Sequence, residues 1–120
     1  MKVLALRGAT TVDENTKAEV DTKTQALVAE MLERNTIGHD DLVSIIFTAT
    51  DDITAEFPAT AARALGLGDV PLLCARELGI AHGKPLTIRV LMHFYGEQAR
   101  GDLHHVYLEG ARSLRDDLPA

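Results

Sequence analysis

The sequence predicts an α+β protein in which one long helix packs against a sheet. Residues 2–8 alternate in the manner of a strand, and residues 16–35 repeat apolar side chains at helical spacing. Three later segments, 42–50, 70–75 and 85–95, are apolar runs typical of strands. The predicted order is therefore strand, long helix, strand, short helix and then three strands.

The ends of these elements follow from their flanking residues. Gly8 is expected to end the first strand, and Thr16, with a glutamate three residues later, forms a capping box that opens the long helix. Pro58 suits the first position of a short helix over 58–65, and Gly66 is expected to stop that helix.

The last part of the chain completes the predicted sheet. In residues 104–115 the alternation of Val106 and Leu108 favours a fifth strand, although Gly110 weakens the pattern. One long helix covers only part of one sheet face, so the remaining apolar surface predicts self-association. We find no repeat or linker, and we expect a single domain over 1–120.

The composition limits the possible partners. The net charge is −6, which argues against nucleic acid and against an anionic membrane surface. The chain has no Trp, 2 Tyr and 3 Phe, so it offers few rings on which bases could stack. No apolar stretch reaches the length of a membrane span, and the single cysteine, Cys74, favours a reducing compartment. We therefore expect a cytoplasmic protein.

The arginines carry the strongest functional signal. Arg89 lies inside the apolar run 86–95, where desolvating an unpaired guanidinium costs roughly several kcal/mol. Arg7 lies in a similar strand context, whereas surface ion pairs explain Arg63 and Arg115 equally well. Arginine holds a planar carboxylate through two parallel hydrogen bonds. The pattern thus predicts a pocket for a small molecule that carries a carboxylate.

Other chemistries are poorly supported. The five histidines have no partner at an established metal-ligand spacing, and neither serine has the sequence context of a nucleophile. Cys74 is interpreted as a structural thiol, and Glu77 gains a functional interpretation only if it lies beside Arg89. We expect no metal and no cofactor.

Six motifs, in order and in register, together resemble the single-domain, trimeric chorismate mutases of the α/β-barrel class. They are RGATTV from Arg7, TATDDI from Thr48, EFPATAAR with Phe57 and Arg63, PLLCARE with Cys74 and Glu77, IRVLMH with Arg89, and HVYLEGARSLR with Tyr107 and Arg115. The resemblance implies a mixed five-stranded sheet on one long helix, and a pseudo-α/β-barrel homotrimer with active sites at subunit interfaces. It also implies the rearrangement of chorismate to prephenate, the branch step toward phenylalanine and tyrosine.

The resemblance further implies a role for each matching residue. Arg89 would stabilise negative charge on the ether oxygen of chorismate and hold the enolpyruvyl carboxylate, together with Arg7 and Tyr107. Glu77 would bind the ring hydroxyl and face the ring, where positive charge would accumulate as the bond breaks. The expected catalytic residues are therefore Arg89, Glu77 and Arg7. The other expected substrate-binding residues are Leu73 and Cys74 near that hydroxyl, Phe57 and Leu114 as apolar walls, Arg63 and Arg115 near the mouth for the second carboxylate, and Ala59 and Thr60.

Two departures from the family pattern concern the mouth of the site. Thr60 stands where the family often carries lysine, and Asp116 stands where it carries proline. Two alternatives also stay open: an imine/enamine deaminase on a similar trimeric fold, and a trimer that binds a carboxylate without catalysis. The combination of Glu77, Arg89 and Tyr107 favours the mutase.

Overall fold

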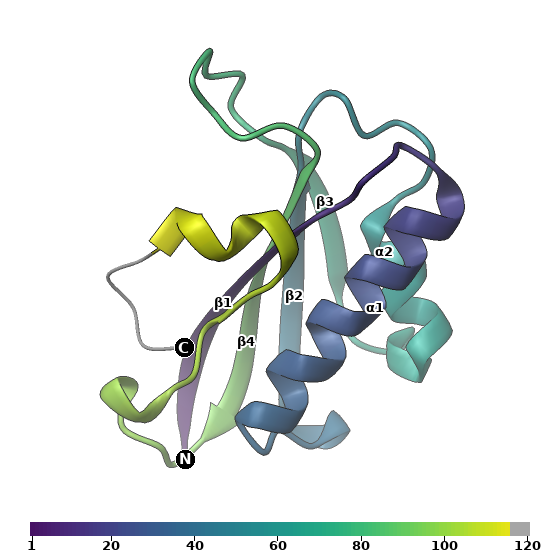
Figure 1. Cartoon of the computed structure of the whole chain (residues 1–120). Helices are drawn as coiled ribbons and strands as arrows, with labels where there is room; N and C mark the ends of the chain where they lie inside the picture. The colour runs from purple at the N-terminus through teal and green to yellow at the C-terminus, as the bar shows by residue number, and fades with distance from the viewer. Residues whose placement is uncertain (116–120) are drawn as a thin grey trace.

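The computed structural model describes residues 1–115, which form a five-stranded sheet with two helices on one side (Figure 1). The strands lie side by side in the order β3-β2-β4-β1-β5. Their bounds are β1 Lys2–Thr11, β2 Leu42–Ala49, β3 Leu72–Arg76, β4 Thr87–Gly96 and β5 Val106–Tyr107. β4 runs antiparallel to β1 and β2, whereas β3 and β5 run parallel to their neighbours. The mixed sheet that the family resemblance implied is thus confirmed.

The long helix has the predicted extent. α1 spans Lys17–Arg34, and the Thr16 side chain accepts a hydrogen bond from the Glu19 backbone N–H. The Glu19 carboxylate accepts from the Asp13 N–H, so it reaches further back than in a capping box. No helix of the described residues is both long and apolar enough to cross a membrane.

The second helix is short and irregular. α2 spans Pro58–Ala62, and one π-helical turn, η2 Arg63–Leu67, continues it. Gly66 breaks the helical geometry inside this segment, one residue before its end, with a left-handed φ of 90° that favours glycine. Three further short segments are 3₁₀-helical: η1 His39–Asp41, η3 Arg100–Asp102 and η4 Glu109–Arg115.

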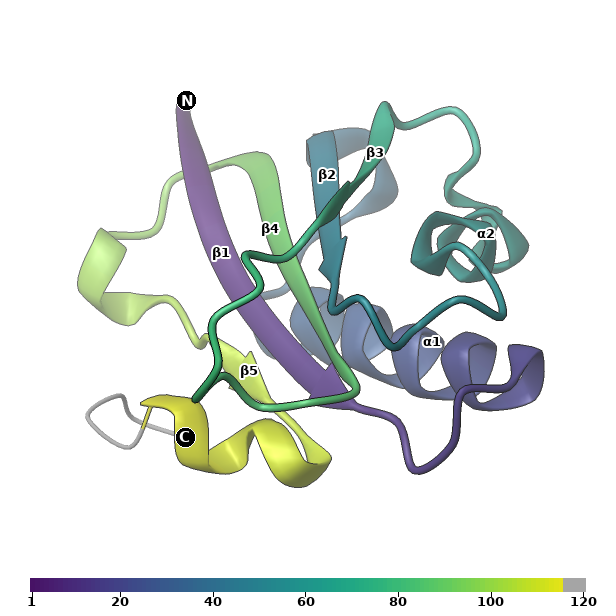
Figure 2. The same ribbon diagram turned by 90° about the horizontal axis from the view of Figure 1, so that it is seen from above.

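The core lies between the sheet and the two helices (Figure 2). Alternate residues of β4, including Val90, Met92 and Phe94, point toward the helices and are buried. Leu27 and Met31 of α1 pack into the same cluster. Strand alternation therefore sends every second residue of β4, Arg89 included, to the opposite face of the sheet.

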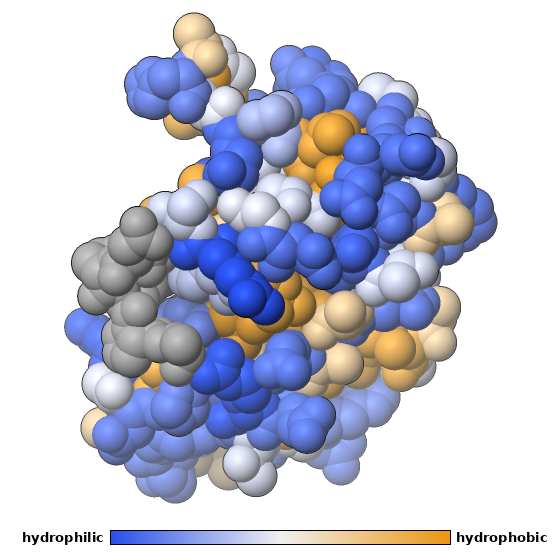
Figure 3. All heavy atoms as spheres, viewed as in Figure 1, coloured by the Kyte–Doolittle hydropathy of each residue, from blue (hydrophilic) through white to orange (hydrophobic). Residues whose placement is uncertain are grey.

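That opposite face is open in the single chain. Val3 of β1 and Leu91 of β4 are exposed on this face, and Leu73 of β3 is 61% exposed there. Figure 3, drawn in the view of Figure 1 with α1 in front of the sheet, shows instead the helix side of the molecule, where hydrophobic residues lie among hydrophilic ones. An uncovered apolar sheet face agrees with the predicted self-association.

Two predictions about the ends of elements were wrong. Gly8 does not end the first strand, because β1 continues to Thr11. Gly8 instead faces α1, where a Cβ atom would lie 2.5 Å from the Met31 sulfur, so glycine here permits close helix packing. The segment 104–115 contains a strand of only two residues and then turns into η4.

Candidate active site

The candidate site lies on the open face of the sheet, where residues of neighbouring strands stand in one row. In the register of the sheet, Thr48 of β2 pairs with Arg89 of β4, Arg89 pairs with Ala9 of β1, and Ala9 pairs with Tyr107 of β5. Paired residues project to the same face. The row therefore brings a hydroxyl, a guanidinium and a phenol together from three different strands.

Glu77 joins this row from the start of the loop that connects β3 to β4. Its Oε1 atom lies 2.6 Å from Arg89 Nε and accepts a 2.8 Å hydrogen bond from Thr48 Oγ1. The Glu77 side chain is 17% exposed and that of Arg89 is 43% exposed. In the single chain Arg89 is thus paired and partly exposed to solvent. The expectation of a desolvated guanidinium was therefore wrong for the single chain.

Arg7 stands in the next row, paired with Leu91. Its backbone N–H donates to His105 Nδ1 at 3.0 Å, which fixes β1 against the segment that leads into β5. Arg7 and Arg89 line one cavity of about 310 Å³ together with Glu77 and Tyr107. The other lining residues are Gly8, Ile46, Thr48, Val90 and Leu91.

The charges around this cavity do not cancel. Arg7 and Arg89 are permanently cationic, and Glu77 is the acidic residue in the described lining. The Glu77 contact uses the Nε atom of Arg89, which leaves the terminal nitrogens of that guanidinium for another acceptor. Since the lining has no Cys, Ser or His among the described residues, the arrangement suits an anion held by fixed charge.

A hydrogen-bonded junction holds the strand ends next to the cavity. The Glu77 N–H donates to the Ala49 carbonyl at 3.0 Å, which extends the pairing of β2 and β3. The Asp52 carboxylate accepts from the Leu86 N–H through both oxygens, at 3.0 and 3.2 Å. Leu86 is left-handed, with φ of 49°, and the Thr50 N–H donates to the Thr87 carbonyl at 3.1 Å. These contacts fix where β4 begins, and therefore where Arg89 lies on the sheet.

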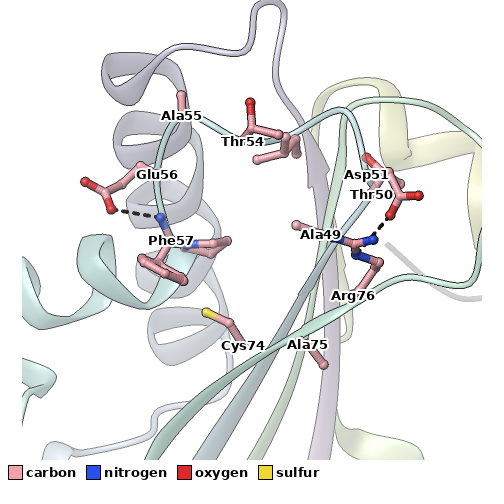
Figure 4. A pocket seen from close by; sticks show the side chains of 12 residues that line it. Ala49, Thr50, Asp51, Thr54, Ala55, Glu56, Phe57, Cys74, Ala75 and Arg76 are labelled. Carbon is pink, nitrogen blue, oxygen red and sulfur yellow. Dashed lines mark hydrogen bonds and ion pairs between the residues drawn. The ribbon is translucent and has the colours of Figure 1, made fainter.

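A second cavity, of about 380 Å³, contains other predicted residues (Figure 4). It lies between the end of β2, the loop 50–57 and β3, and it is lined by Phe57 and Cys74. The Cys74 thiol points toward Phe57, and Arg76 pairs with Asp51 at the rim at 3.3 Å. Phe57 is 67% exposed, although it is a large apolar side chain.

The remaining predicted residues lie outside both cavities, around α2 and η4 and on β3. Arg63 donates to Thr60 Oγ1 at 3.5 Å, and Ala59 is buried in the core. Leu114 is half-buried in η4. Leu73 lies on the open sheet face, beside Ile46 in the register. The Arg115 side chain and Asp116 fall outside the described part of the chain.

An ion-pair network holds the beginning of α2. The backbone N–H of Phe57 donates to the Glu56 carboxylate at 2.8 Å and, with Lys17 and Thr60, holds the pKa of that carboxyl below its ordinary value. The hydrogen bond to Asp21 and the pair with Glu56 raise the pKa of Lys17. Glu56 thereby fixes the loop that presents Phe57.

Sequence reasoning did not find Thr48, Ile46 or Leu91 as lining residues. None of them is unusual in its sequence context, since threonine and aliphatic residues are common in strands. Their place follows only from the register, which pairs Thr48 with Arg89 and Ile46 with Leu91. A prediction of that register would have found them.

Fold and site together describe an α+β protein with a cavity that suits a small anion, because two arginines line it. Comparison with known proteins gives the family. Residues 3–118 match the model of the family described as chorismate mutase type I. The chain is 43% identical over 117 residues to Chorismate mutase AroH of Thermus thermophilus, covering 97% of this chain and 96% of that protein. It is 38% identical over 119 residues to Chorismate mutase AroH of Bacillus subtilis, covering 98% and 94%.

A solved structure agrees with these matches. A chorismate mutase from Clostridium thermocellum superposes with a TM-score of 0.89 at 45% identity, covering 91% of this chain and 97% of that one. The chain belongs to the chorismate mutase type I family. The predicted family, fold class and isomerase class are thus confirmed, and the deaminase and the non-catalytic trimer are set aside.

Proposed function

We propose that the protein converts chorismate to prephenate with Arg89 as the fixed cation, at a site that a second copy of the chain completes. The observation that carries this proposal is the convergence of Arg7, Glu77, Arg89 and Tyr107 on one cavity. Family membership supplies the substrate class, and the cavity supplies the groups that recognise it.

The reaction needs positioning and charge stabilisation. The [3,3] rearrangement breaks the ether C–O bond while a C–C bond forms, so no proton moves and no covalent intermediate with the enzyme arises. Negative charge grows on the ether oxygen as its bond stretches. The terminal nitrogens of Arg89, which Glu77 leaves available, then stabilise the transition state more than the ground state.

The other groups at the cavity fold the substrate. Arg7 and Tyr107 hold the enolpyruvyl carboxylate, so that the flexible side chain of chorismate lies over its ring. Glu77 accepts a hydrogen bond from the ring hydroxyl through Oε2, because both of its contacts within the chain use Oε1. This arrangement brings the two reacting carbons close together before reaction.

The charge count supports a contribution from a second copy. Arg7, Arg89 and Glu77 leave a net charge of about one positive unit, whereas chorismate carries two carboxylates. Phe57, Thr60 and Arg63 lie elsewhere on the same chain and are free to face a neighbouring copy, with Cys74 beside Phe57. In this proposal Arg63 of one copy pairs with the ring carboxylate in the cavity of the next.

Trimerisation and location belong to the same proposal. The open sheet face, with Leu73 and Leu91 exposed, is the surface that we expect three copies to bury. Cys74 is a free thiol, in keeping with a reducing cytoplasm. Leu114 and Arg115 are proposed to line the mouth of the site.

The direct test follows the loss of chorismate absorbance with purified protein. The proposal predicts saturable turnover to prephenate, with a rate far above that in buffer. Binding of chorismate without acceleration, or no binding at all, would refute it.

A further inference from the structure

Thr48 contacts Glu77, the acidic residue of the cavity, and none of the steps of the proposed reaction uses it. It lies on β2, between β3 and β4, with Ala75 and Arg89 as its register partners. Its hydroxyl donates to Glu77 Oε1 at 2.8 Å and is partly buried. We propose that Thr48 is a positioning residue, which holds the Glu77 carboxylate so that Arg89 keeps its terminal nitrogens for the substrate. This inference rests on the proposed function and deepens it.

The two partners differ in how firmly they are held. Thr48 belongs to a strand with neighbours on both sides, and its branched side chain has restricted χ1 rotation. Glu77 begins the loop 77–86, which projects from the end of the sheet (Figure 1), and it has a longer side chain with more rotamers. The strand residue therefore orients the loop residue.

The contact between Thr48 and Glu77 matters because of the Glu77 oxygen that it uses. Thr48 Oγ1 and Arg89 Nε both bind Oε1 of Glu77, at 2.8 and 2.6 Å. A carboxylate that meets an arginine without such a constraint favours two parallel hydrogen bonds. If Glu77 rotated to form that bidentate pair, it would occupy a terminal nitrogen of Arg89. The Thr48 hydroxyl opposes this rotation, because it keeps Oε1 on the side of β2.

The test compares Thr48→Val with Thr48→Ser. Valine keeps the shape and removes the hydroxyl, whereas serine keeps the hydroxyl. We expect Thr48→Val to lower kcat on the order of ten-fold, with a smaller change in KM, since the loss falls on the transition-state contact. Thr48→Ser should stay within about three-fold of the unmodified enzyme. Equal activity of the valine variant and the unmodified enzyme would overturn the proposal, as would a serine variant as slow as the valine variant.

Thr10→Val is the matched control. Thr10 lies in β1, is fully buried, and its hydroxyl has no hydrogen-bond partner among the described residues. The same substitution there should leave kcat unchanged. A loss of kcat in Thr10→Val equal to that in Thr48→Val would show that the effect is a general response of the sheet.

A double-variant cycle separates action through Glu77 from other effects. In a Glu77→Ala background, Thr48→Val should change kcat by less than about two-fold, because the acceptor is gone. A full ten-fold loss in that background would overturn the proposal. If the unmodified enzyme did not turn chorismate over, the proposed function itself would fail. The Thr48→Val result can be read only when the unmodified enzyme is active, so failure of the proposed function and failure of the Thr48 role are distinguishable.

Discussion

Arg89 combines a constant charge with a fixed orientation at the residue scale. Its Nε atom is bound by Glu77, and Glu77 is held in turn by Thr48. An internal acid could have neutralised the guanidinium, but here it binds one edge and leaves a cavity in front of the other. Glu77 therefore fixes the orientation of the Arg89 guanidinium through one of its nitrogens.

Replacement of Arg89 by lysine tests that orientation. Lysine keeps the positive charge but loses the planar group that can contact Glu77 and a substrate oxygen at once. We expect Arg89→Lys to lower kcat on the order of 100-fold or more, with an unchanged circular dichroism spectrum. Turnover close to that of the unmodified enzyme would show that the charge acts from another position.

The sequence predicted the identity of these residues better than their environment. Arg89 was expected to be buried, because its strand neighbours are apolar. The strand period explains the difference: Ile88 and Val90 point into the core, while Arg89 and Leu91 point to the open face. A run of apolar residues does not reveal which face of the strand is covered by the same chain and which face is left for a second copy to cover.

At the element scale, the junction between β2 and β4 matters most for the site. The Asp52 carboxylate accepts through both oxygens from the left-handed Leu86, directly before β4 begins, and also from the Thr50 hydroxyl. Asp51, the preceding residue, makes an exposed pair with Arg76. Two neighbouring aspartates thus differ sharply in structural importance.

This difference predicts a contrast between two variants. Asp52→Ala should lower the free energy of unfolding by about 1–3 kcal/mol, because the Leu86 N–H loses its acceptor. Asp51→Ala should cost less than about 1 kcal/mol, as exposed pairs do. Denaturant unfolding measures both, and equal effects would contradict the assignment of the junction to Asp52.

The beginning of α2 should depend on pH through Glu56. Hydrogen bonds and Lys17 lower the pKa of this carboxyl, so its stabilisation is present above the ordinary value and is lost as the pH falls through the lowered one. Glu56→Gln should therefore lower Tm at neutral pH, and the difference should vanish in acid. Glu33→Gln, on the exposed surface of α1, is the control. A Tm difference that is independent of pH would contradict this account.

Elements with a strong period were predictable from the sequence, and elements fixed by distant contacts were not. α1 has a clear helical repeat and a side-chain cap, and its predicted extent was close. The segment 104–115 alternates weakly, and distant partners decide its course. The Asn35 side chain bonds the backbone of His104 through both its donor and its acceptor, which sets the path into β5. Nothing local encodes that contact.

At the scale of the whole molecule, the site residues form two groups on one chain. Arg7, Arg89 and Tyr107 line the cavity on the sheet face, while Phe57 and Arg63 lie around the loop 50–57 and α2. The family resemblance placed them in one site. The two observations agree if each site joins the first group of one copy to the second group of another.

Hybrid trimers test this arrangement, and with it the central claim, most directly. Arg89→Ala and Arg63→Ala chains, each poorly active alone, should regain activity when co-expressed and purified as mixed trimers. An interface that joins an intact Arg89 to an intact Arg63 is unmodified, so random mixing restores about one quarter of the sites. A mass in solution of three times 13.0 kDa would accompany this recovery. Mixed trimers with no more activity than the two parents would contradict a site shared between copies.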